Sequence, residues 1–305
     1  MRSLITLPDI SGADIAGIVE QAVKLADRPC PPATLSGRAV GIYFRRSSTR
    51  TRTSFWRAAT MLGAAVVTFG PDDLQLTTGE SLADTARVLG GYLDILVVRT
   101  NDELAELREL DGAGGPAIVN ALTRREHPTQ ALADLTTLRE EFGELSGRHV
   151  LYIGEGNSTA RALVQATAMT PGLRLTLVTP PGYGLEEGDL TEARRLGAEP
   201  GRVVQLHAVP VPDEPVDAVY TSRWQTMGVS KDDPGWLTAF EPFRVTGELF
   251  DQVGDAHTVF LHDLPAIRGQ EVTDEVLDGA RSRAWRQSYH KMTSAMAVLE
   301  WCALR

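Results

Sequence analysis

Hydrophobic residues recur along the chain in two alternating patterns. Short, mainly apolar runs, which are typical of buried β-strands, alternate with stretches in which apolar residues return every three or four positions, as on one face of a helix. This alternation continues through both halves of the chain. It predicts an α/β protein with two doubly wound domains, each with a mainly parallel sheet flanked by helices. The predicted strands are 39–44, 65–69, 95–98, 117–120, 149–153, 173–178, 203–206 and 218–220.

The boundary between the domains is predicted near 142–147. A helical pattern that starts at residue 129 ends there, and a new strand begins at 149. An amphipathic helix is expected over 9–28, because the proline-rich segment 29–32 cannot continue it. The strand at 65–69 is almost wholly apolar, which indicates a sheet that is covered on both faces.

Composition and charge exclude several classes of protein. Of 305 residues, 43% are apolar and 23% charged, and no apolar run approaches the roughly 20 residues of a membrane helix. Pro8 and Asp9 interrupt the first apolar residues, so no signal peptide is predicted. Cys30 and Cys302 stand near opposite ends and predict neither a disulfide framework nor a metal site. We expect a cytoplasmic protein without a membrane partner, and its net charge of −10 argues against nucleic-acid binding.

The segment 44–55 joins a predicted strand to a predicted helix and is the densest group of hydrogen-bond donors in the chain. It holds six hydroxyl and four guanidinium side chains. A helix that starts in such a turn presents free N–H groups and its positive end to an anion. In a chain of net charge −10, the cluster of Arg45, Arg46, Arg50, Arg52 and Arg57 is expected to act locally on that anion. We favour a phosphate site over a merely capped, solvated helix start.

This segment resembles the carbamoyl-phosphate signature of the aspartate and ornithine carbamoyltransferases. The match is Ser48-Thr49-Arg50-Thr51-Arg52, followed by Ser54-Phe55. Further stretches match the family in the same order, closest to its ornithine branch. They are Gly79 to Leu89, His127-Pro128-Thr129-Gln130-Ala131-Leu132-Ala133-Asp134, Gly156-Asn157, Trp224 with Met227-Gly228, and His262 with Leu264-Pro265. The resemblance implies a C-terminal helix that returns to the N-terminal domain. It therefore implies a carbamoyl-phosphate-binding domain of 1–143 plus 286–305 and an acceptor-binding domain of 144–285.

The resemblance also implies a reaction, in which the carbamoyl group of carbamoyl phosphate passes to an amine of an amino acid and phosphate leaves. No metal or organic cofactor is implied. The loop with Gln75 is one that the family lends to a neighbouring subunit, so a homotrimer with active sites between subunits is expected. The residues expected to bind the donor are Ser48, Thr49, Arg50, Thr51, Arg52, Gln75, Arg99, His127, Gln130, Leu264 and Lys291. Of these, Arg50, Thr51, Arg99, His127 and Gln130 are expected to act in catalysis.

The acceptor site departs most from the family. Ser222 stands where ornithine enzymes carry the aspartate that holds the ornithine α-ammonium, and Asp263 stands where they carry a cysteine. We interpret the acceptor as the side-chain amine of ornithine or a related diamino acid, which fits a role in arginine biosynthesis. The residues expected to bind it are Asn157, Ser222, Arg223, Gln225, Thr226, Met227, Asp263 and Leu264.

Three other interpretations stay open. Arg223 and Gln225 have the Arg-x-Gln spacing with which aspartate enzymes hold acceptor carboxylates, so an aspartate-type acceptor is the first alternative. A catalytically silent homologue that binds the anion without turnover is the second. A dinucleotide-binding protein is disfavoured, because Thr159 stands where the third glycine of that fingerprint is needed.

Overall fold

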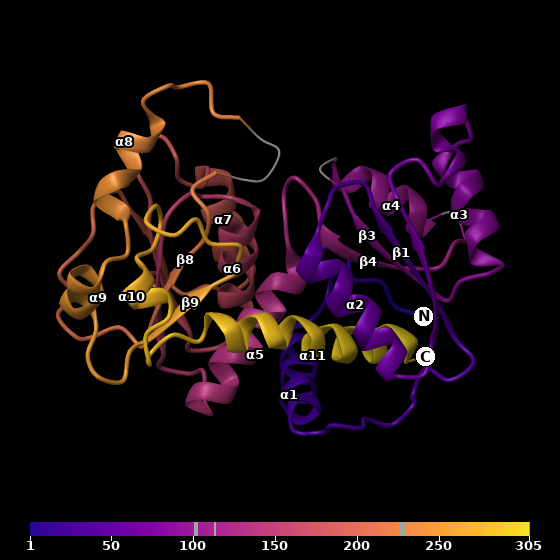
Figure 1. The fold of residues 1–305 in the computed structure, drawn as a ribbon, viewed down its shortest axis with the longest axis horizontal. Helices are drawn as coiled ribbons and strands as arrows, with labels where there is room; N and C mark the ends of the chain where they lie inside the picture. Colours follow the sequence, from indigo (N-terminus) through magenta and orange to yellow (C-terminus); the bar gives the residue numbers. More distant parts are fainter. Residues whose placement is uncertain (101–102, 113, 226–229, 305) are drawn as a thin grey trace. The chain divides into compact units, whose positions relative to one another are not determined.

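The computed structural model of the chain describes residues 1–100, 103–112, 114–225 and 230–304. It divides into two compact units, Met1–Thr136 with Tyr289–Arg305, and Thr137–Ser288. Each unit is built on one parallel sheet with helices packed around it (Figure 1). The predicted fold class is therefore confirmed.

The sheet of the first unit has the strand order β2-β1-β3-β4, and all neighbours are parallel. Its strands β1, β3 and β4 are buried along almost their whole length, as their near-continuous apolar runs predict. The strands are β1 (Ala39–Phe44), β2 (Ala65–Phe69), β3 (Ile95–Arg99) and β4 (Ala117–Leu122).

The strand predicted at 65–69 is confirmed as β2, but the expectation that both of its faces are covered is wrong for the single chain. β2 lies at the edge of the sheet and pairs with β1, and three of its five residues are exposed. Val67, for example, keeps 40% of its surface accessible in the single chain. An apolar run indicates strand character, but the position of a strand in the sheet depends on topology, which the run does not encode.

The helices of the first unit start and end where local signals place them. The first helix begins at Gly12 rather than at residue 9, because Ser11 caps it by accepting a hydrogen bond from Asp14 N. The helix α4 was not predicted. The helical segments are η1 (Leu7–Asp9), α1 (Gly12–Ala26), α2 (Thr49–Met61), η2 (Gln75–Thr78), α3 (Leu82–Gly90), α4 (Leu104–Gly112) and α5 (Pro128–Phe142), which continues into the second unit.

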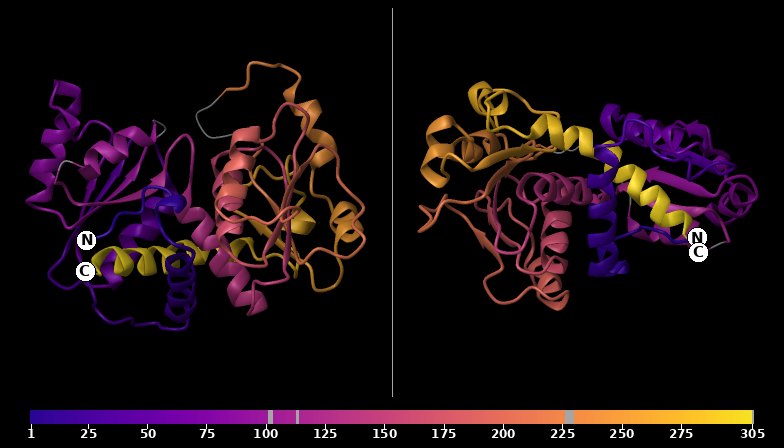
Figure 2. Two further views of the ribbon diagram at one scale, coloured as in Figure 1. Left: turned by 180° about the vertical axis from the view of Figure 1, so that it is seen from behind. Right: turned by 90° about the horizontal axis from the view of Figure 1, so that it is seen from below.

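The last helix, α11 (Ala284–Ala303), ends in the first unit. Glu300 accepts hydrogen bonds from Gln21 Nε2 at 2.8 Å and Thr34 Oγ1 at 2.7 Å. Arg2 N donates to Cys302 O at 3.0 Å, so the two ends of the chain lie side by side (Figure 2). Residues more than 250 positions apart are thus joined in one unit.

The second unit has a parallel sheet of order β7-β6-β5-β8-β9, whose last strand was not predicted. One core cluster packs side chains of β5, β8 and β9, among them Ile153, Val219 and Phe260, against α9 and α10. The elements are β5 (His149–Ile153), α6 (Ser158–Met169), β6 (Arg174–Val178), α7 (Glu187–Arg195), β7 (Val203–Leu206), β8 (Ala218–Thr221), α8 (Trp236–Phe240), η3 (Glu241–Phe243), α9 (Gly247–Val253), β9 (Val259–His262) and α10 (Asp274–Leu277).

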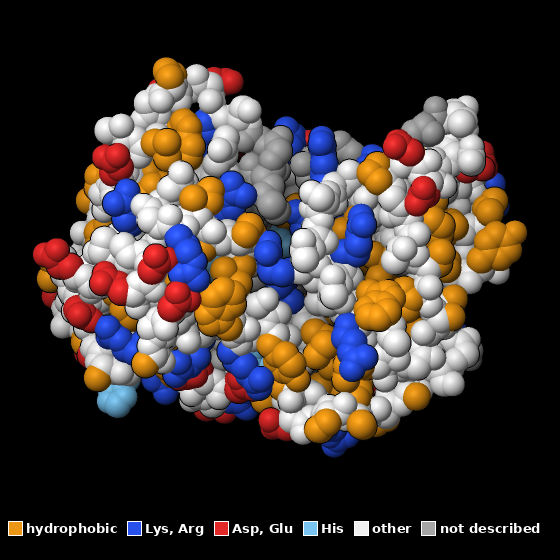
Figure 3. Space-filling view, viewed as in Figure 1, with side chains coloured by type: hydrophobic (Ala, Val, Ile, Leu, Met, Phe, Trp, Pro, Cys, Tyr) orange, Lys and Arg blue, Asp and Glu red, His pale blue; other side chains and the backbone are white. Residues whose placement is uncertain are grey.

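The surface carries charges of both signs. On the face shown in Figure 3, acidic and basic side chains are interspersed, and hydrophobic side chains lie between them. Among the described helices, none combines the length and the apolar character that crossing a membrane requires.

Candidate active site

The segment between β1 and α2 holds the predicted phosphate-binding residues. Ser48 is the N-cap residue of α2, but its side chain makes no capping hydrogen bond. Its Oγ instead accepts a hydrogen bond from Arg99 Nη1 at 3.1 Å. The N–H groups of the first turn of α2 are therefore not used by their cap side chain, and the positive end of the helix can face an anion.

The order of the strands explains why Ser48 and Arg99 meet. β1 and β3 are neighbours, and Phe44 at the end of β1 is in register with Arg99 at the end of β3. The chain turns outward in opposite directions from these two strands, so their carboxyl ends form the switch point at which open α/β sheets bind ligands. Arg99 itself is 6% exposed, and its guanidinium contacts the phosphate-binding segment through the hydrogen bond to Ser48.

Not all arginines of the cluster face an anion. Arg45 departs from that expectation, because its Nη2 lies 2.6 Å from Glu106 Oε1 and its Nε donates to Tyr43 Oη at 2.8 Å. Arg46 and Arg57 are exposed. The half-buried Arg52 lies over the ring of Phe44 at 5.5 Å, and its Nε has no hydrogen-bond partner among the described residues. Thr51 lies in the first turn of α2 and is buried.

His127 lies at the junction of β4 and α5, as predicted, and is 6% exposed. Its Nδ1 is 3.4 Å from Thr129 Oγ1. Burial, and next the positive charges of Lys291 and Arg99, hold the pKa of His127 well below 6.5. The imidazole is therefore neutral at pH 7, and a neutral imidazole can donate an N–H to a carbonyl oxygen without carrying charge.

This pKa predicts a pH-dependent stability. Below the unfolded-state pKa of about 6.5 the unfolded chain protonates His127 and the folded chain does not, so stability is complete above that pH and falls below it. The loss is at most about 1.4 kcal/mol per pH unit for this one residue. When the free energy of unfolding is measured with denaturant between pH 7 and 5, it should fall less steeply with decreasing pH in His127→Gln than in the wild type. An equal pH dependence in the two proteins would contradict the lowered pKa of His127.

Gln130 lies one turn after His127 and is part of a buried chain of polar groups. Its Nε2 donates to Asp134 Oδ1 at 2.7 Å, and its Oε1 accepts from Lys291 Nζ. Lys291 comes from α11 and is only 7% exposed. The structure thus places Arg99, His127, Gln130 and Lys291 in one unit with the phosphate-binding segment.

Gln75 lies apart from these residues. It is exposed at the start of η2, and its Oε1 accepts from Thr78 Oγ1 at 3.0 Å. No described contact joins its side chain to Ser48, Arg99 or His127 within the single chain. Its assignment to the donor site stays a prediction.

In the second unit, Asn157 and Ser222 follow β5 and β8, the two strands between which the switch point of this sheet lies. Asn157 caps α6, because its Oδ1 accepts from Thr159 N and Ala160 N at 3.0 and 3.1 Å. Its Nδ2 donates to Ser222 Oγ at 3.0 Å, and Tyr152 Oη lies 2.7 Å from the same oxygen. The loop after β5 is thereby tied to the end of β8.

Asp263 follows β9 at the same edge. Its Oδ2 accepts from Thr159 Oγ1 at 3.1 Å, which brings the carboxylate next to the first turn of α6. Its Oδ1 is 3.5 Å from His262 Nδ1, but that nitrogen accepts from Leu264 N, so this contact is not an ion pair. The side chain of Asp263 is 18% exposed.

The backbone of Leu264 is held by a buried pair. Leu264 N donates to His262 Nδ1 at 2.8 Å, so Nε2 must carry the ring proton, which it donates to Glu271 Oε1 at 3.2 Å. Ile267 N donates to the same carboxylate oxygen at 2.6 Å. This support fixes Leu264 at φ 52°, a backbone conformation that leucine rarely adopts. Neither His262 nor Glu271 is accessible to solvent.

The segment after β8 contains the remaining predicted acceptor residues. Ser222 is buried, and Arg223 and Gln225 are half-buried. Arg223 Nε is buried without a hydrogen-bond partner among the described residues. Thr226 and Met227 lie outside the described residues.

Lys231 fastens the chain after this segment to the loop that follows β5. Its Nζ pairs with Glu155 Oε1 and lies 5.0, 5.5 and 5.3 Å from the ring centres of Tyr183, Trp236 and Phe240. A cation held by three aromatic rings and a carboxylate is restrained from several sides. No spacing pattern predicts this contact, because its members come from three separate segments of the chain.

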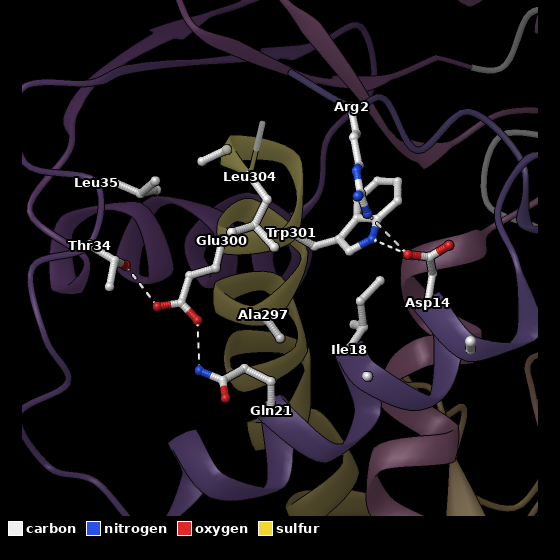
Figure 4. A pocket seen from close by; sticks show the side chains of 13 residues that line it. Arg2, Asp14, Ile18, Gln21, Thr34, Leu35, Ala297, Glu300, Trp301 and Leu304 are labelled. Atoms are coloured by element: carbon white, nitrogen blue, oxygen red, sulfur yellow. Dashed lines mark hydrogen bonds and ion pairs between the residues drawn. The ribbon is translucent and has the colours of Figure 1, made fainter.

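A different concavity in the first unit shares no residue with the predicted donor site. This cavity of about 570 Å³ lies where α1, α11 and the loop before β1 meet (Figure 4). Asp14 accepts from Trp301 Nε1 at 2.8 Å and from Arg2 Nη1 at 3.1 Å, and Glu300 is bound as described above. Both carboxylates that line the cavity thus have protein partners, and their hydrogen bonds join the end of α11 to α1.

Two family models together match nearly the whole chain. The model of the aspartate/ornithine carbamoyltransferase carbamoyl-P binding domain matches residues 2–140, and that of the Asp/Orn binding domain matches residues 146–302. The chain belongs to the aspartate/ornithine carbamoyltransferase family. Its resemblance to that family, inferred from short motifs, is thereby confirmed.

Relatives and solved structures agree with this membership. The chain is 37% identical to an ornithine carbamoyltransferase of Haloquadratum walsbyi over 97% of its length and 96% of the relative's. It is 36% identical to that of Gloeobacter violaceus over 97% and 94%. The structure of ornithine carbamoyltransferase from Pyrococcus furiosus superposes with a TM-score of 0.88 at 34% identity, covering 98% of this chain and 96% of that one.

Proposed function

We propose that this carbamoyltransferase moves the carbamoyl group of carbamoyl phosphate to the side-chain amine of ornithine, giving a ureido product and phosphate. One observation carries the proposal. A first helical turn without a side-chain cap, the buried Arg99 and the neutral, buried His127 lie in one unit, at the carboxyl edge of its sheet. Full-length similarity to enzymes named ornithine carbamoyltransferase supports ornithine as the acceptor.

In the donor site, one group of residues binds the phosphate and another polarises the carbonyl group. The segment 48–52 provides backbone N–H groups, three hydroxyls and the guanidinium groups of Arg50 and Arg52 to the phosphate. Thr51, Arg99 and His127 donate to the carbonyl oxygen, on which negative charge develops during attack. Each donor aimed at such an oxygen is worth about 3 kcal/mol in the transition state.

The acceptor site must present an uncharged amine. The amine lone pair forms the new C–N bond, the bond between the carbamoyl carbon and the phosphate oxygen breaks, and the leaving phosphate takes a proton from the amine. Asn157 and Ser222 would hold the amino-acid end, and the Leu264 carbonyl would accept from the carbamoyl NH2. Holding both reactants in line accounts for much of the remaining rate.

Ser222 is suited to a weak contact with an ammonium group. Tyr152 Oη donates its one hydrogen to Glu155 O at 2.8 Å, so the Ser222 hydroxyl donates to Tyr152 Oη. Ser222 Oγ accepts from Asn157, which leaves one lone pair that can accept a hydrogen bond from the ammonium group of the amino-acid substrate. This neutral contact is weaker than one to a carboxylate. We therefore expect a lower affinity for the α-ammonium of ornithine than an aspartate at position 222 would give.

A second candidate is an aspartate-type acceptor. The half-buried Arg223, whose Nε has no partner among the described residues, favours this reading, because a second carboxylate on the acceptor could occupy it. Gln225 stands two residues on, at the spacing that this reading requires.

An acceptor panel decides between these functions. The purified protein is given carbamoyl phosphate with ornithine, 2,4-diaminobutyrate, lysine or aspartate, and both ureido product and released phosphate are measured. We expect product from ornithine at a rate well above the others. Product from aspartate alone would replace the proposal with the second candidate, and no product from any amine would indicate a silent anion-binding homologue.

The proposal also covers the quaternary structure, the cellular compartment and the assignment of each substrate to a domain. The exposed Gln75 segment fits a loop that reaches the active site of a neighbouring subunit, as a homotrimer with shared sites requires. We place the enzyme in the cytoplasm. Residues 1–143 with 286–305 would bind the donor, and residues 144–285 the acceptor.

A further inference from the structure

A chain of three buried polar side chains runs beside His127 in the first unit. Gln130 Nε2 donates to Asp134 Oδ1 at 2.7 Å, and Lys291 Nζ donates to Gln130 Oε1. The exposed fractions of Asp134, Gln130 and Lys291 are 0%, 1% and 7%. A buried ammonium, a buried amide and a buried carboxyl group are thus linked in series, next to residues that polarise the donor.

The Lys291 ammonium and the Asp134 carboxylate determine the orientation of the Gln130 amide between them. An ammonium group only donates hydrogen bonds, and a carboxylate only accepts them. The Gln130 amide can satisfy both neighbours in one orientation, with its NH2 toward Asp134 and its oxygen toward Lys291. Without the carboxylate, the amide could flip and turn its NH2 toward the lysine.

The spacing on α5 makes this arrangement possible. His127, Gln130 and Asp134 follow one another at intervals of three and four residues, so they lie on the same face of the helix. Lys291 reaches this face from α11, 161 residues away along the chain. The last residue of the motif His-Pro-x-Gln-x-Leu-x-Asp thus has a physical partner.

We propose that Asp134 is a positioning residue of the donor site, which fixes the Gln130 amide so that its oxygen holds the Lys291 ammonium beside His127. The proposal rests on the donor site described above. Asp134 does not touch the donor. It acts through Gln130 and Lys291, and the held ammonium adds positive charge where carbamoyl phosphate brings negative charge.

Two cations then act on His127. They are Lys291 from α11 and Arg99 from β3, while Thr129 from α5 offers a hydroxyl at 3.4 Å. The charge of Lys291 is one cause of the low pKa of His127, after burial. Removing that charge should therefore raise the pKa of His127, although burial keeps it below 6.5.

The first test is the variant Asp134→Asn, compared with Thr136→Val. The control lies on the same helix, is fully buried and loses one hydrogen bond, from Thr136 Oγ1 to Leu132 O at 2.7 Å. We expect Asp134→Asn to weaken binding of a phosphonate mimic of carbamoyl phosphate about tenfold and to raise KM for the donor but not for the acceptor. The control should stay within about twofold. Equal donor affinity in wild type and Asp134→Asn would overturn the proposal.

The second test does not depend on turnover or on the folding of the first variant. In Lys291→Met, NMR titration of labelled histidine should show a raised pKa of His127, because one of the two positive charges that lower this pKa is removed. An unchanged His127 pKa in Lys291→Met would overturn the proposed contact. A wild-type protein that carbamoylates no amine would remove the proposed transfer reaction. Binding of the phosphonate mimic would still test the role of Asp134, and the His127 titration would still test the position of Lys291.

Discussion

The variant Arg50→Ala is expected to bind a phosphonate mimic of carbamoyl phosphate at least about 100-fold more weakly than the wild type. Arg50 is the second residue of α2, at the positive end of a helix whose N-cap side chain is bound to Arg99 instead. Its planar guanidinium can donate two charge-assisted hydrogen bonds to one phosphate group, each worth about 1.5–3 kcal/mol. Calorimetric titration of both proteins with the mimic measures the difference.

The matched control is Arg57→Ala. Arg57 lies two turns further along the same helix, is exposed, and its replacement removes the same charge. We expect its affinity for the mimic to stay within about twofold of the wild type at physiological ionic strength, because exposed distant charges are screened. Equal losses in both variants would show a general effect of net charge. Undiminished binding in Arg50→Ala would remove the phosphate-site assignment.

Most of the fold follows from local patterns. The strands β1, β3 and β5 are near-continuous apolar runs, and each is buried in the centre of its sheet. The same reasoning fails for β2, whose residues are just as apolar although the strand lies at an edge. A run of apolar residues predicts that a segment forms a strand. Whether that strand lies in the centre or at the edge of its sheet depends on the order of all the strands, which the run does not encode.

The candidate site shows the same limit at the level of side chains. Residues 48–52 are consecutive, and His127, Gln130 and Asp134 share a helical face. Sequence spacing alone therefore predicts that the members of each group lie close together. The contact between Lys291 and Gln130 joins residues 161 positions apart, and no spacing rule gives the direction of its hydrogen bond.

The two units stabilise their binding edges in different ways. In the first, Arg99 at the end of β3 is hydrogen-bonded to Ser48 at the start of α2, and Lys291 of α11 is hydrogen-bonded to Gln130 of α5. In the second, the buried pair of His262 and Glu271 holds the backbone that follows β9. Within this pair the carboxylate of Glu271 holds both His262 Nε2 and Ile267 N, so one substitution should remove the support of this backbone.

Glu271→Ala is accordingly expected to lower the free energy of unfolding by about 4 kcal/mol. Glu271 Oε1 accepts from the buried His262 Nε2 and from the half-buried Ile267 N, and both donors would lose this partner. Each such orphaned group costs about 1–3 kcal/mol, in addition to the lost side-chain packing. Because His262 also holds Leu264 N, kcat should fall in the folded fraction as the Leu264 carbonyl loses its fixed position. Denaturant unfolding and steady-state kinetics on the same sample measure the two effects.

The comparison variant is Glu275→Ala, four residues further along the chain. Glu275 also accepts a hydrogen bond from a backbone N–H, that of Gly247 at 3.0 Å, but it is exposed, so water can replace the lost partner. We expect a loss below about 1 kcal/mol and an unchanged kcat for this variant. Similar losses in both variants would mean that the His262–Glu271 pair has no special part in holding Leu264. The large difference is expected because water can reach the carboxylate of Glu275 and cannot reach that of Glu271.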